Sequence, residues 1–310
     1  MSGTLTPAAK AAVLAEALPY IRRFWGKKVV VKYGGNALAG SDGTDPLASF
    51  AADIVLMSSV GMQPVVVHGG GPQIGDLMGR LGMEPVFRDG LRVTDEATLD
   101  VARMVLVGKV NREIVAAINT HGALALGLSG EDGRLLMAKQ RDPALGFVGD
   151  ITAVNTGVLC GLLDQELIPV IATIGVDDEG QAYNINADTA AAAIAEALEA
   201  EKLVYLTDIE GIRRDVDDPE SRISTLTPVQ AEELIADGTV SEGMIPKVRS
   251  CVEAVQAGVG VAHILDGRVP RALLLEIFTE EGIGTMVTET SPNVMVTETS
   301  PNGMATEAGK

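Results

Sequence analysis

Aromatic residues and cysteines are scarce in this chain. Phe, Trp and Tyr make up 3% of its 310 residues, which is too few for the stacking surfaces that bind single-stranded nucleic acid. Cys160 and Cys251 are its two cysteines. Because they lie far apart and match no paired spacing, we expect buried thiols of a cytosolic protein, and neither a disulfide nor a metal site.

Basic residues are few relative to acidic ones. The chain carries 24 Lys and Arg against 42 Asp and Glu, a net charge of −18, which opposes binding to nucleic acid or to an anionic membrane. No signal peptide and no apolar run long enough to span a bilayer is found. We therefore expect a cytoplasmic protein with no nucleic-acid or membrane partner. Its length allows one large α/β domain or two lobes.

Three familiar site motifs are missing as well. The sequence has no G-x-x-x-x-G-K-[ST], which excludes a P-loop, and no G-x-G-x-x-G, which leaves a Rossmann dinucleotide site unsupported. His68–Gly71 reads His-Gly-Gly-Gly, as in the oxyanion holes of lipases and esterases. That reading requires a Gly-x-Ser-x-Gly elbow, and the chain has none.

Runs of β-branched residues alternate with alanine-rich stretches. The runs that predict strands are Val29–Tyr33, Val65–His68, Pro169–Thr173, Leu203–Thr207 and Val261–Leu265. Helices are expected at Ala187–Glu201 and Thr227–Asp237, among others. This alternation predicts a mainly parallel sheet covered by helices on both faces. Between Leu124 and Ile151, an Asp-Gly turn and alternating residues predict a hairpin outside the main sheet.

The N-terminal stretch has the pattern of an amphipathic helix. Apolar residues recur at helical spacing in one stripe, formed by Leu14, Leu18, Ile21 and Trp25. Pro19 falls within the stripe and should bend or break the helix. The helix either packs on its own domain or serves another subunit.

The C-terminal end repeats the octapeptide MVTETSPN. The copies lie at Met286–Asn293 and Met295–Asn302. The second copy and the polar residues after it are expected to be disordered, and no function follows from the repeat.

Glycines follow two predicted strands directly. Gly34 and Gly35 follow Lys32 and Tyr33, and the glycines of His68–Gly71 precede a helix expected to begin near Pro72. Glycine lets the backbone approach a ligand closely, and a helix N-terminus offers free N–H groups and the positive end of the helix dipole. In open α/β sheets, ligands bind beyond the carboxyl ends of strands. These turns therefore predict an anion site.

Polar residues gather near other predicted strand ends. Asn184, Asn186 and Asp188 alternate with apolar residues before an alanine-rich helix; helix capping explains one of them, and substrate binding or the orientation of lysines would explain the others. Lys247 falls in the first turn of another predicted helix and, taken alone, reads as a solvated surface lysine. Arg92 lies in a polar loop, either solvated or clamping a carboxylate with its planar guanidinium.

Taken together and in this order, the segments KYGG, HGGG, GLRVT, NINAD, LTDIEG and EGMIPK resemble the amino acid kinase family, and within it the members that phosphorylate N-acetyl-L-glutamate. The likeness runs from about Gly26 to Val287. It implies a three-layer αβα sandwich around a mainly parallel sheet. The implied parts are an oligomerisation helix at 1–26, an amino-acid-substrate lobe at 27–200, a nucleotide lobe at 201–287 and a disordered tail at 288–310.

The resemblance also implies a reaction, the transfer of the ATP γ-phosphoryl group to the side-chain carboxylate of N-acetyl-L-glutamate in arginine biosynthesis. Mg²⁺ would arrive with the nucleotide, held largely by phosphates and water. Lys32 and Lys247 match the lysines that stabilise the transition state, and Asp188 matches the carboxylate that orients both. The matches for acetylglutamate binding are Gly70, Gly71, Arg92 and Asn184. Those for the nucleotide and its phosphates are Gly34, Gly35, Gly69, Asp208, Gly211, Thr239 and Ser241. His68 is expected to be structural.

Arginine-inhibited members of the family share a kinked N-terminal helix, which interlaces dimers into a hexamer, a trimer of dimers; Pro19 would cause the kink here. Their arginine-binding positions match Tyr20, His263, Glu276 and Gly282. The resemblance thus implies feedback inhibition by L-arginine. Two alternatives stay open, another amino acid kinase (glutamate 5-kinase or aspartokinase) and a non-catalytic arginine-responsive binding protein of the same fold.

Overall fold

The three-dimensional structure is a computed structural model that describes residues 6–34, 45–215, 218–241, 243–279 and 282–289. Within these ranges no helix has both the length and the apolar character needed to cross a membrane. Cys160 and Cys251 are free; Cys251 is buried as expected, whereas Cys160 is partly exposed.

The body of the protein is built on an eight-stranded sheet with the order β12-β14-β13-β11-β1-β2-β8-β5. All neighbouring strands are parallel except β13 and β14. The strands are β1 (Lys28–Tyr33), β2 (Gln63–His68), β5 (Ala125–Ser129), β8 (Ile168–Ala172), β11 (Lys202–Thr207), β12 (Thr225–Leu226), β13 (Val261–Asp266) and β14 (Thr285–Val287). The five predicted strand runs correspond to β1, β2, β8, β11 and β13.

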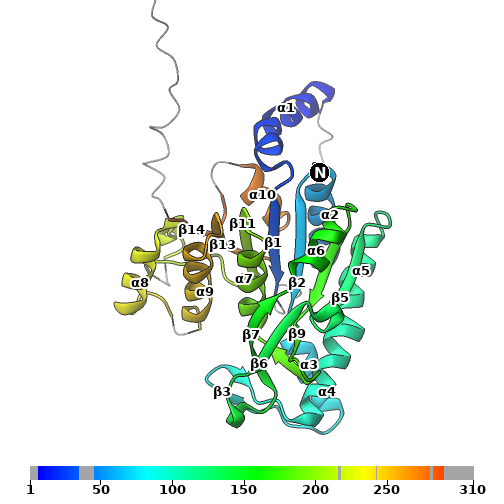
Figure 1. Cartoon of the computed structure of the whole chain (residues 1–310). Helices are drawn as coiled ribbons and strands as arrows, with labels where there is room; N and C mark the ends of the chain where they lie inside the picture. The colour runs from blue at the N-terminus through cyan, green and yellow to red at the C-terminus, as the bar shows by residue number, and fades with distance from the viewer. Residues whose placement is uncertain (1–5, 35–44, 216–217, 242, 280–281, 290–310) are drawn as a thin grey trace, which may run out of the picture.

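Helices cover both faces of this sheet (Figure 1). Side chains alternate across each strand, so Val29 and Val31 face one hydrophobic core and Val30 faces the other. One core is closed by α2 (Pro46–Ser59), α3 (Gly71–Arg80), α4 (Glu96–Val105), α5 (Asn111–Asn119) and α10 (Ala272–Phe278). The other is closed by α6 (Thr156–Leu163), α7 (Ala187–Ala197), α8 (Pro228–Ala236) and α9 (Ile245–Gln256). The predicted αβα sandwich is confirmed.

Short helical segments join several of these elements. A π-helical segment, η2 (Leu106–Val110), makes α4 and α5 continuous. The others are the 3₁₀ turns η3 (Asp132–Arg134), η4 (Pro143–Leu145) and η5 (Pro219–Ser221). Helix α7 ends four residues before the predicted Glu201, and Leu198 is its C-cap.

A small closed barrel lies beside the sheet, at the end of the molecule opposite α1 (Figure 1). Its strands are β6 (Leu136–Gln140), β7 (Val148–Val154), β9 (Ile174–Val176) and β10 (Ala182–Ile185). A two-stranded hairpin of β3 (Phe87–Arg88) and β4 (Leu91–Arg92) lies at the same end.

The predicted hairpin at Leu124–Ile151 is partly wrong. Its first strand, β5, belongs to the edge of the main sheet and pairs in parallel with β8. The antiparallel pair is β6 with β7. The Asp132-Gly133 turn separates β5 from β6, which do not pair, and Gly133 has a φ of 58°. The local turn was predicted correctly, whereas the pairing partner was not.

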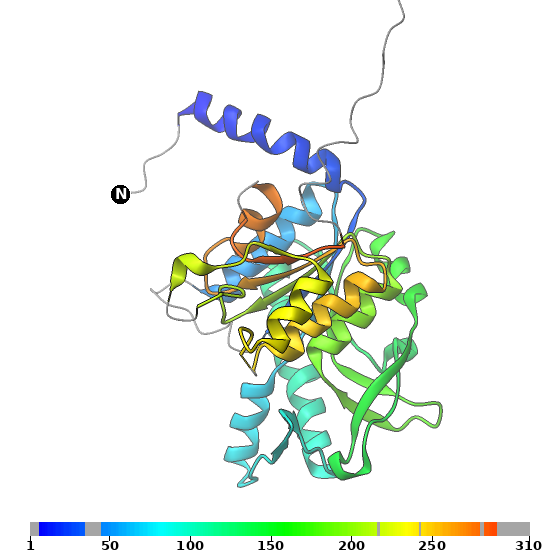
Figure 2. The same cartoon turned by 90° about the vertical axis from the view of Figure 1, so that its left-hand side faces the viewer.

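Helix α1 (Pro7–Phe24) extends outside the sandwich (Figure 2). It continues through Pro19, so the break that this proline predicts does not occur. Within this chain Phe24 is buried, but Leu14 is 69%, Leu18 51% and Trp25 67% exposed. Most of the predicted apolar stripe therefore has no cover from its own domain.

The domain boundaries that the resemblance implies at residues 26, 200 and 287 stay predictions. Strand β1 belongs to the first predicted lobe and β11 to the second, and the two strands are hydrogen-bonded neighbours in one sheet. The second MVTETSPN copy lies outside the described residues.

Candidate active site

Three charged side chains meet at the carboxyl end of β1. Lys32 lies near the end of that strand, Asp188 in the first turn of α7 and Lys247 in the first turn of α9. Lys32 Nζ lies 2.8 Å from Asp188 Oδ1, and Lys247 Nζ lies 2.7 Å from Asp188 Oδ2. One carboxylate thus holds two ammonium groups, and Lys247 is not the solvated surface residue that its position alone suggests.

Asp188 is ionised and firmly placed. Burial raises the pKa of its carboxyl, but the charges of Lys32 and Lys247 outweigh burial and lower that pKa. The Asn186 side chain caps α7 by accepting from the Asp188 and Thr189 N–H groups. The Tyr205 hydroxyl donates to the Asp188 carbonyl oxygen at 3.1 Å. The carboxylate is held by its helix as well as by the lysines.

A pocket of about 230 Å³ opens beside this triad. Its walls come from the glycine turn after β2, from the β3–β4 hairpin and from β10 and the start of α7. Eight residues singled out in the sequence line it together: Lys32, Gly69, Gly70, Gly71, Arg92, Asn184, Asn186 and Asp188. Phe87, Leu106 and Ile185 add apolar wall. The pocket combines a cationic end with amide and apolar sides, which suits a small anionic ligand.

Arg92 stands at the rim of this pocket. Its Nη2 donates to the Gly71 carbonyl oxygen at 3.0 Å, and its Nη1 lies 3.3 Å from Met78 Sδ. The guanidinium carbon lies 4.7 Å from the centre of the Phe87 ring. Partial burial lowers the pKa of Arg92, although arginine stays charged at neutral pH. These contacts fix a planar cation that has donors left for a ligand carboxylate.

Asn184 is tied to Arg92 through a residue that the sequence analysis did not single out. Asn184 Nδ2 donates to Thr94 Oγ1 at 3.3 Å, and Thr94 Oγ1 donates to the Arg92 carbonyl oxygen at 2.9 Å. Thr94 is fully buried. It is the last residue of the GLRVT segment, so the motif pointed to it.

Glycine is required beside Lys32. A Cβ at Gly34 would lie 2.9 Å from Lys32 Nζ and 2.9 Å from the Leu206 carbonyl oxygen, closer than atoms tolerate. The absence of a side chain therefore leaves room for the Lys32 ammonium. Gly35 lies outside the described residues.

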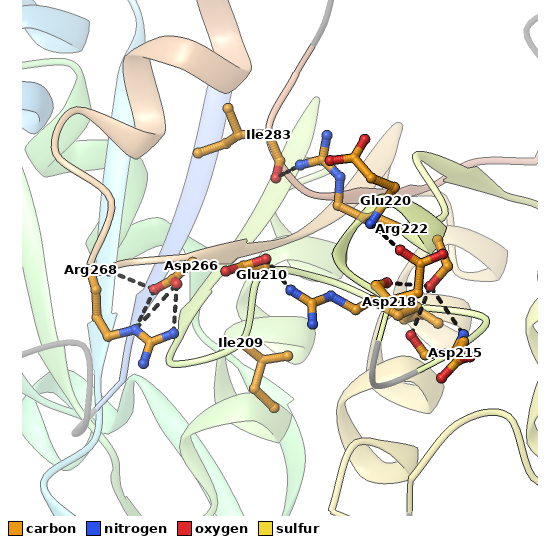
Figure 3. Close-up of polar contacts among 12 residues, drawn as sticks. Ile209, Glu210, Asp215, Asp218, Glu220, Arg222, Asp266, Arg268 and Ile283 are labelled. Atoms are coloured by element: carbon orange, nitrogen blue, oxygen red, sulfur yellow. Dashed lines mark hydrogen bonds and ion pairs between the residues drawn. The ribbon is translucent and has the colours of Figure 1, made fainter.

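A second pocket, of about 390 Å³, lies at the start of α9, the helix that carries Lys247. Four residues predicted for the nucleotide line it: Asp208, Gly211, Thr239 and Ser241. Gly211 has a φ of 129°, and a Cβ there would lie 2.7 Å from Thr285 Oγ1. Glu210 and Arg268 also line this pocket, and Figure 3 shows the Arg268 guanidinium paired with Asp266.

Helix α9 connects the two pockets. Met244, its N-cap, lines the second pocket, and Lys247, three residues later, contacts Asp188 in the wall of the first. The two lysines and Asp188 therefore lie between the pockets. This arrangement can stabilise negative charge on a group that moves from one pocket to the other.

A separate buried cluster contains three of the four residues predicted for arginine. His263 Nδ1 lies 2.7 Å from Glu276 Oε1, and Ile283 N–H donates to Glu276 Oε2 at 2.7 Å. Gly282 has a φ of 57°, and a Cβ there would lie 3.1 Å from Glu276 Oε2. Burial acts to raise the pKa of the Glu276 carboxyl, but the hydrogen bond from His263 helps to lower that pKa to about 2.

The same cluster includes Lys202, which the sequence analysis missed. Its Nζ lies 3.0 Å from His263 Nε2 and 5.1 Å from the centre of the Phe24 ring. Burial lowers the pKa of Lys202 to about 8 and that of His263 to about 4. Tyr20, the fourth predicted residue, lies one helical turn before Phe24 and is partly buried. The cluster thus joins the end of α1 to the sheet.

His68 is fully buried at the end of β2 and does not line either pocket. Burial lowers the pKa of its imidazole to about 4, so the ring is neutral at neutral pH. This environment agrees with the structural role expected for it and not with that of a general base.

Two lysines around one carboxylate, between two pockets at the carboxyl ends of parallel strands, define a phosphoryl-transfer type of site. The amino acid kinase family profile matches residues 27–266, and the chain belongs to this family. It is 56% identical over 289 residues to the acetylglutamate kinase of Symbiobacterium thermophilum, covering 90% of this chain and 98% of that protein. It is 54% identical to the acetylglutamate kinase of Acidothermus cellulolyticus, covering 93% of this chain and 99% of that protein.

Among solved structures, the chain is similar to N-acetylglutamate synthase from Neisseria gonorrhoeae complexed with coenzyme A and N-acetyl-glutamate. The TM-score is 0.79 and the identity 32%, with 91% of this chain and 64% of the synthase chain covered. The same synthase complexed with coenzyme A and L-arginine gives a TM-score of 0.77 and the same identity, with 91% and 66% covered. This chain thus spans about two thirds of the synthase.

Proposed function

We propose that this protein is an ATP-dependent kinase that phosphorylates the side-chain carboxylate of N-acetyl-L-glutamate, within arginine biosynthesis. The observation that carries the proposal is the Asp188 carboxylate, which holds Lys32 and Lys247 between two pockets. The similarity to acetylglutamate kinases over almost their whole length supports the choice of substrate.

The acceptor occupies the 230 Å³ pocket. Arg92 binds a carboxylate of the substrate with its planar guanidinium, and Asn184 supplies an amide. Backbone N–H groups of Gly70 and Gly71 bind the reacting carboxylate. That group is already ionised at neutral pH, so the step needs no general base.

The nucleotide occupies the second pocket, at Asp208, Gly211, Thr239 and Ser241. Amides of Gly34 and Gly69 support the phosphates beside Lys32, and the role of Gly35, which lies outside the described residues, stays a prediction from the family resemblance. The described residues contain no group of three side chains able to hold a metal ion. Mg²⁺ enters with ATP, held largely by phosphates and water, as is usual for nucleotide-bound magnesium.

Lys32 and Lys247 stabilise the phosphoryl group as it moves. In phosphoryl transfer, charge spreads over the oxygens in flight, and catalysis is mainly positioning and electrostatic stabilisation. Each ammonium group approaches from a different element, β1 or α9. Asp188 fixes both directions, so the lysines need little reorganisation during the step.

An acyl phosphate trap tests this reaction. With Mg-ATP, N-acetyl-L-glutamate and hydroxylamine, the enzyme should form a hydroxamate together with ADP, because hydroxylamine attacks an acyl phosphate. ADP release without hydroxamate would mean that water, and not a carboxylate, accepts the phosphoryl group. Asp188→Asn serves as the matched control for contaminating kinases.

Two other functions have weaker support from the site. Glutamate 5-kinase or aspartokinase activity would require an anionic partner for a free α-ammonium group. A non-catalytic arginine-binding protein would not need Lys32, Asp188 and Lys247 assembled at 2.7–2.8 Å. The same hydroxamate assay with free L-glutamate and L-aspartate separates these cases.

L-Arginine is the proposed feedback inhibitor, bound at the cluster of His263, Glu276 and Gly282 beside Tyr20. The Glu276 carboxylate suits a guanidinium or α-ammonium group. The exposed stripe of α1 suits assembly into a hexamer, a trimer of dimers, since large exposed apolar groups favour burial. A cytoplasmic location fits these small-molecule partners.

Removal of residues 1–25 tests the regulatory part. We expect the truncated protein to lose the hexamer in light scattering and to become insensitive to arginine, while turnover persists. A truncated protein that stays hexameric or fully arginine-sensitive would contradict the role of α1 and leave the kinase proposal intact.

A further inference from the structure

The buried imidazole of His68 lies between the sheet and the glycine turn of the acceptor pocket. Its Nδ1 lies 3.0 Å from the Gly69 carbonyl oxygen, and its Nε2 lies 3.1 Å from Asn111 Nδ2. Both ring nitrogens therefore have partners, and one partner is the peptide that begins the turn. Asn111 is the first residue of α5 and is itself fully buried.

The hydrogen bonds of Asn111 determine which ring nitrogen carries the proton. Asn111 Nδ2 also donates to the Val170 carbonyl oxygen at 2.9 Å, and Asn111 Oδ1 accepts from the Arg112 guanidinium. The amide orientation is thereby fixed, with its NH₂ group toward His68. Nε2 of His68 must then accept, so the proton lies on Nδ1 and is donated to the Gly69 oxygen.

The surroundings of the His68 imidazole favour its neutral form. Burial lowers the pKa of His68 to about 4, and the positive charge of Arg112 acts in the same direction. Its direct partners are the Gly69 carbonyl and the Asn111 amide, neither of which is charged. A single tautomer is therefore present across the neutral pH range.

This hydrogen bond sets the direction of the next amide. In a trans peptide the C=O and N–H point to opposite sides. Because the Gly69 carbonyl points at His68, the Gly70 N–H of the same peptide points away from the imidazole. Gly70 is the N-cap of α3, where N–H groups have no partner within the helix, and it lines the acceptor pocket.

The turn is also held from its other side. A Cβ at Gly70 would lie 2.7 Å from Leu106 Cδ2 and 3.3 Å from Val110 Cγ2. Leu106 and Val110 are the first and last residues of the π-helical segment η2, and Asn111 follows directly. Segments of this kind often occur at functional sites. The same part of the α4–α5 helix thus supports the turn and orients His68.

We propose that His68 is a positioning residue for phosphoryl transfer: held by Asn111 as the Nδ1–H tautomer, it fixes the Gly69 peptide so that the Gly70 N–H faces the reacting carboxylate. The inference deepens the proposed kinase function and rests on it. His68 touches no substrate and acts only through the backbone of the turn.

The tautomer is measured on the unaltered protein. Long-range ¹H–¹⁵N correlation spectra of the imidazole rings report which nitrogen is protonated, and the chain has three histidines to assign. We expect a His68 ring protonated at Nδ1 alone between about pH 8 and about pH 6, because its pKa lies well below this range. A proton on Nε2, or titration within this range, would overturn the proposal.

Two substitutions then separate positioning from mere packing. In His68→Asn, the new amide lies near the position of the imidazole Nδ1 and can still donate to the Gly69 carbonyl oxygen. In His68→Gln, the amide lies near the position of Nε2, which leaves the Gly69 oxygen without a donor. We expect H68Q to lose kcat by a factor on the order of 10², H68N to stay at least about tenfold more active than H68Q, and KM for ATP to change little in either. The exposed His121 supplies the control H121Q, which should match the unaltered protein.

A structural role alone would lower the melting temperature of both variants and leave kcat of the folded protein equal in the two. Equal kcat values in H68N and H68Q would therefore refute the proposal. Where a variant fails to fold, the tautomer measured on the unaltered protein tests the proposal instead. If the unaltered protein shows the Nδ1–H tautomer but does not phosphorylate N-acetyl-L-glutamate, the kinase proposal fails and the geometry of the turn stands.

Discussion

Asp188→Asn removes one charge from the centre of the site and keeps the shape of the side chain. The carboxylate oxygens now lie 2.8 Å from Lys32 Nζ and 2.7 Å from Lys247 Nζ. An amide can accept from one lysine through its oxygen, but its NH₂ group then faces the other ammonium. The buried Lys32 and the partly buried Lys247 would lose their common counter-ion.

The expected cost is large for stability and for rate. Removing one partner of a buried ion pair typically destabilises a protein by about 3–5 kcal/mol, a substantial part of a typical stability of about 5–15 kcal/mol. Loss of one oriented donor typically lowers kcat by a factor on the order of 10²–10³. Because Asp188 orients both lysines, we expect the upper end of that range.

Urea unfolding and initial rates of ADP formation measure the two effects. Asp178→Asn is the matched control, since Asp178 is 90% exposed and lies 3.7 Å from Arg134 in a surface ion pair, a kind worth about 0–1 kcal/mol. A D188N protein with kcat within about threefold of the unaltered enzyme and unchanged stability would refute the reasoning on the triad.

Further predictions concern single groups. Lys32→Ala and Lys247→Ala should each lower kcat by a factor on the order of 10²–10³ with a much smaller effect on KM for acetylglutamate, because their contacts strengthen in the transition state; initial-rate kinetics check this. Arg92→Ala should instead raise KM for acetylglutamate by about one to two orders of magnitude, as expected for a lost charged hydrogen bond, while the neighbouring exposed Arg88→Ala leaves it unchanged. The pKa values of His68 and His263 are lowered from 6.5 to about 4, so the unfolded chain binds protons that the folded state does not. The unfolding free energy should fall as the pH is lowered from 6.5 to 4 and should be constant between about pH 6.5 and 8, above which the lowered pKa of Lys202 makes it rise. A constant value on acidification, measured by urea unfolding, would contradict the buried, neutral imidazoles.

The sequence predicted the central sheet and the place of Lys32 in it for one physical reason. Inner parallel strands are buried on both faces, so they appear as continuous β-branched runs, and their carboxyl ends meet at one edge of the sheet. Lys32 at the end of such a run was therefore expected near the glycine turn after β2. The roles given to Asp188 and Lys247 came from the family resemblance.

The failures come from interactions between distant segments. The sequence pattern of β5 fits a hairpin strand as well as a strand at the sheet edge. Only its pairing with β8 shows that it belongs to the edge of the main sheet. Thr94 and Tyr205 act through hydrogen bonds to Asn184 and to the Asp188 carbonyl, far away along the chain. No local pattern marks such contacts.

The continuity of α1 through Pro19 has a local explanation. Proline removes the hydrogen bond that its N–H would give to the carbonyl of Ala15. Ala15 is exposed, so water can satisfy that carbonyl. A proline on the solvated side of a helix costs less than the rule for helix interiors suggests.

Substrate choice distinguishes an acetylglutamate kinase from the other amino acid kinases. Initial rates of ADP formation from Mg-ATP are measured with N-acetyl-L-glutamate, free L-glutamate and free L-aspartate at equal concentrations. We expect turnover of N-acetyl-L-glutamate and far lower rates with both free amino acids. Equal or higher rates with L-glutamate or L-aspartate would contradict this expectation.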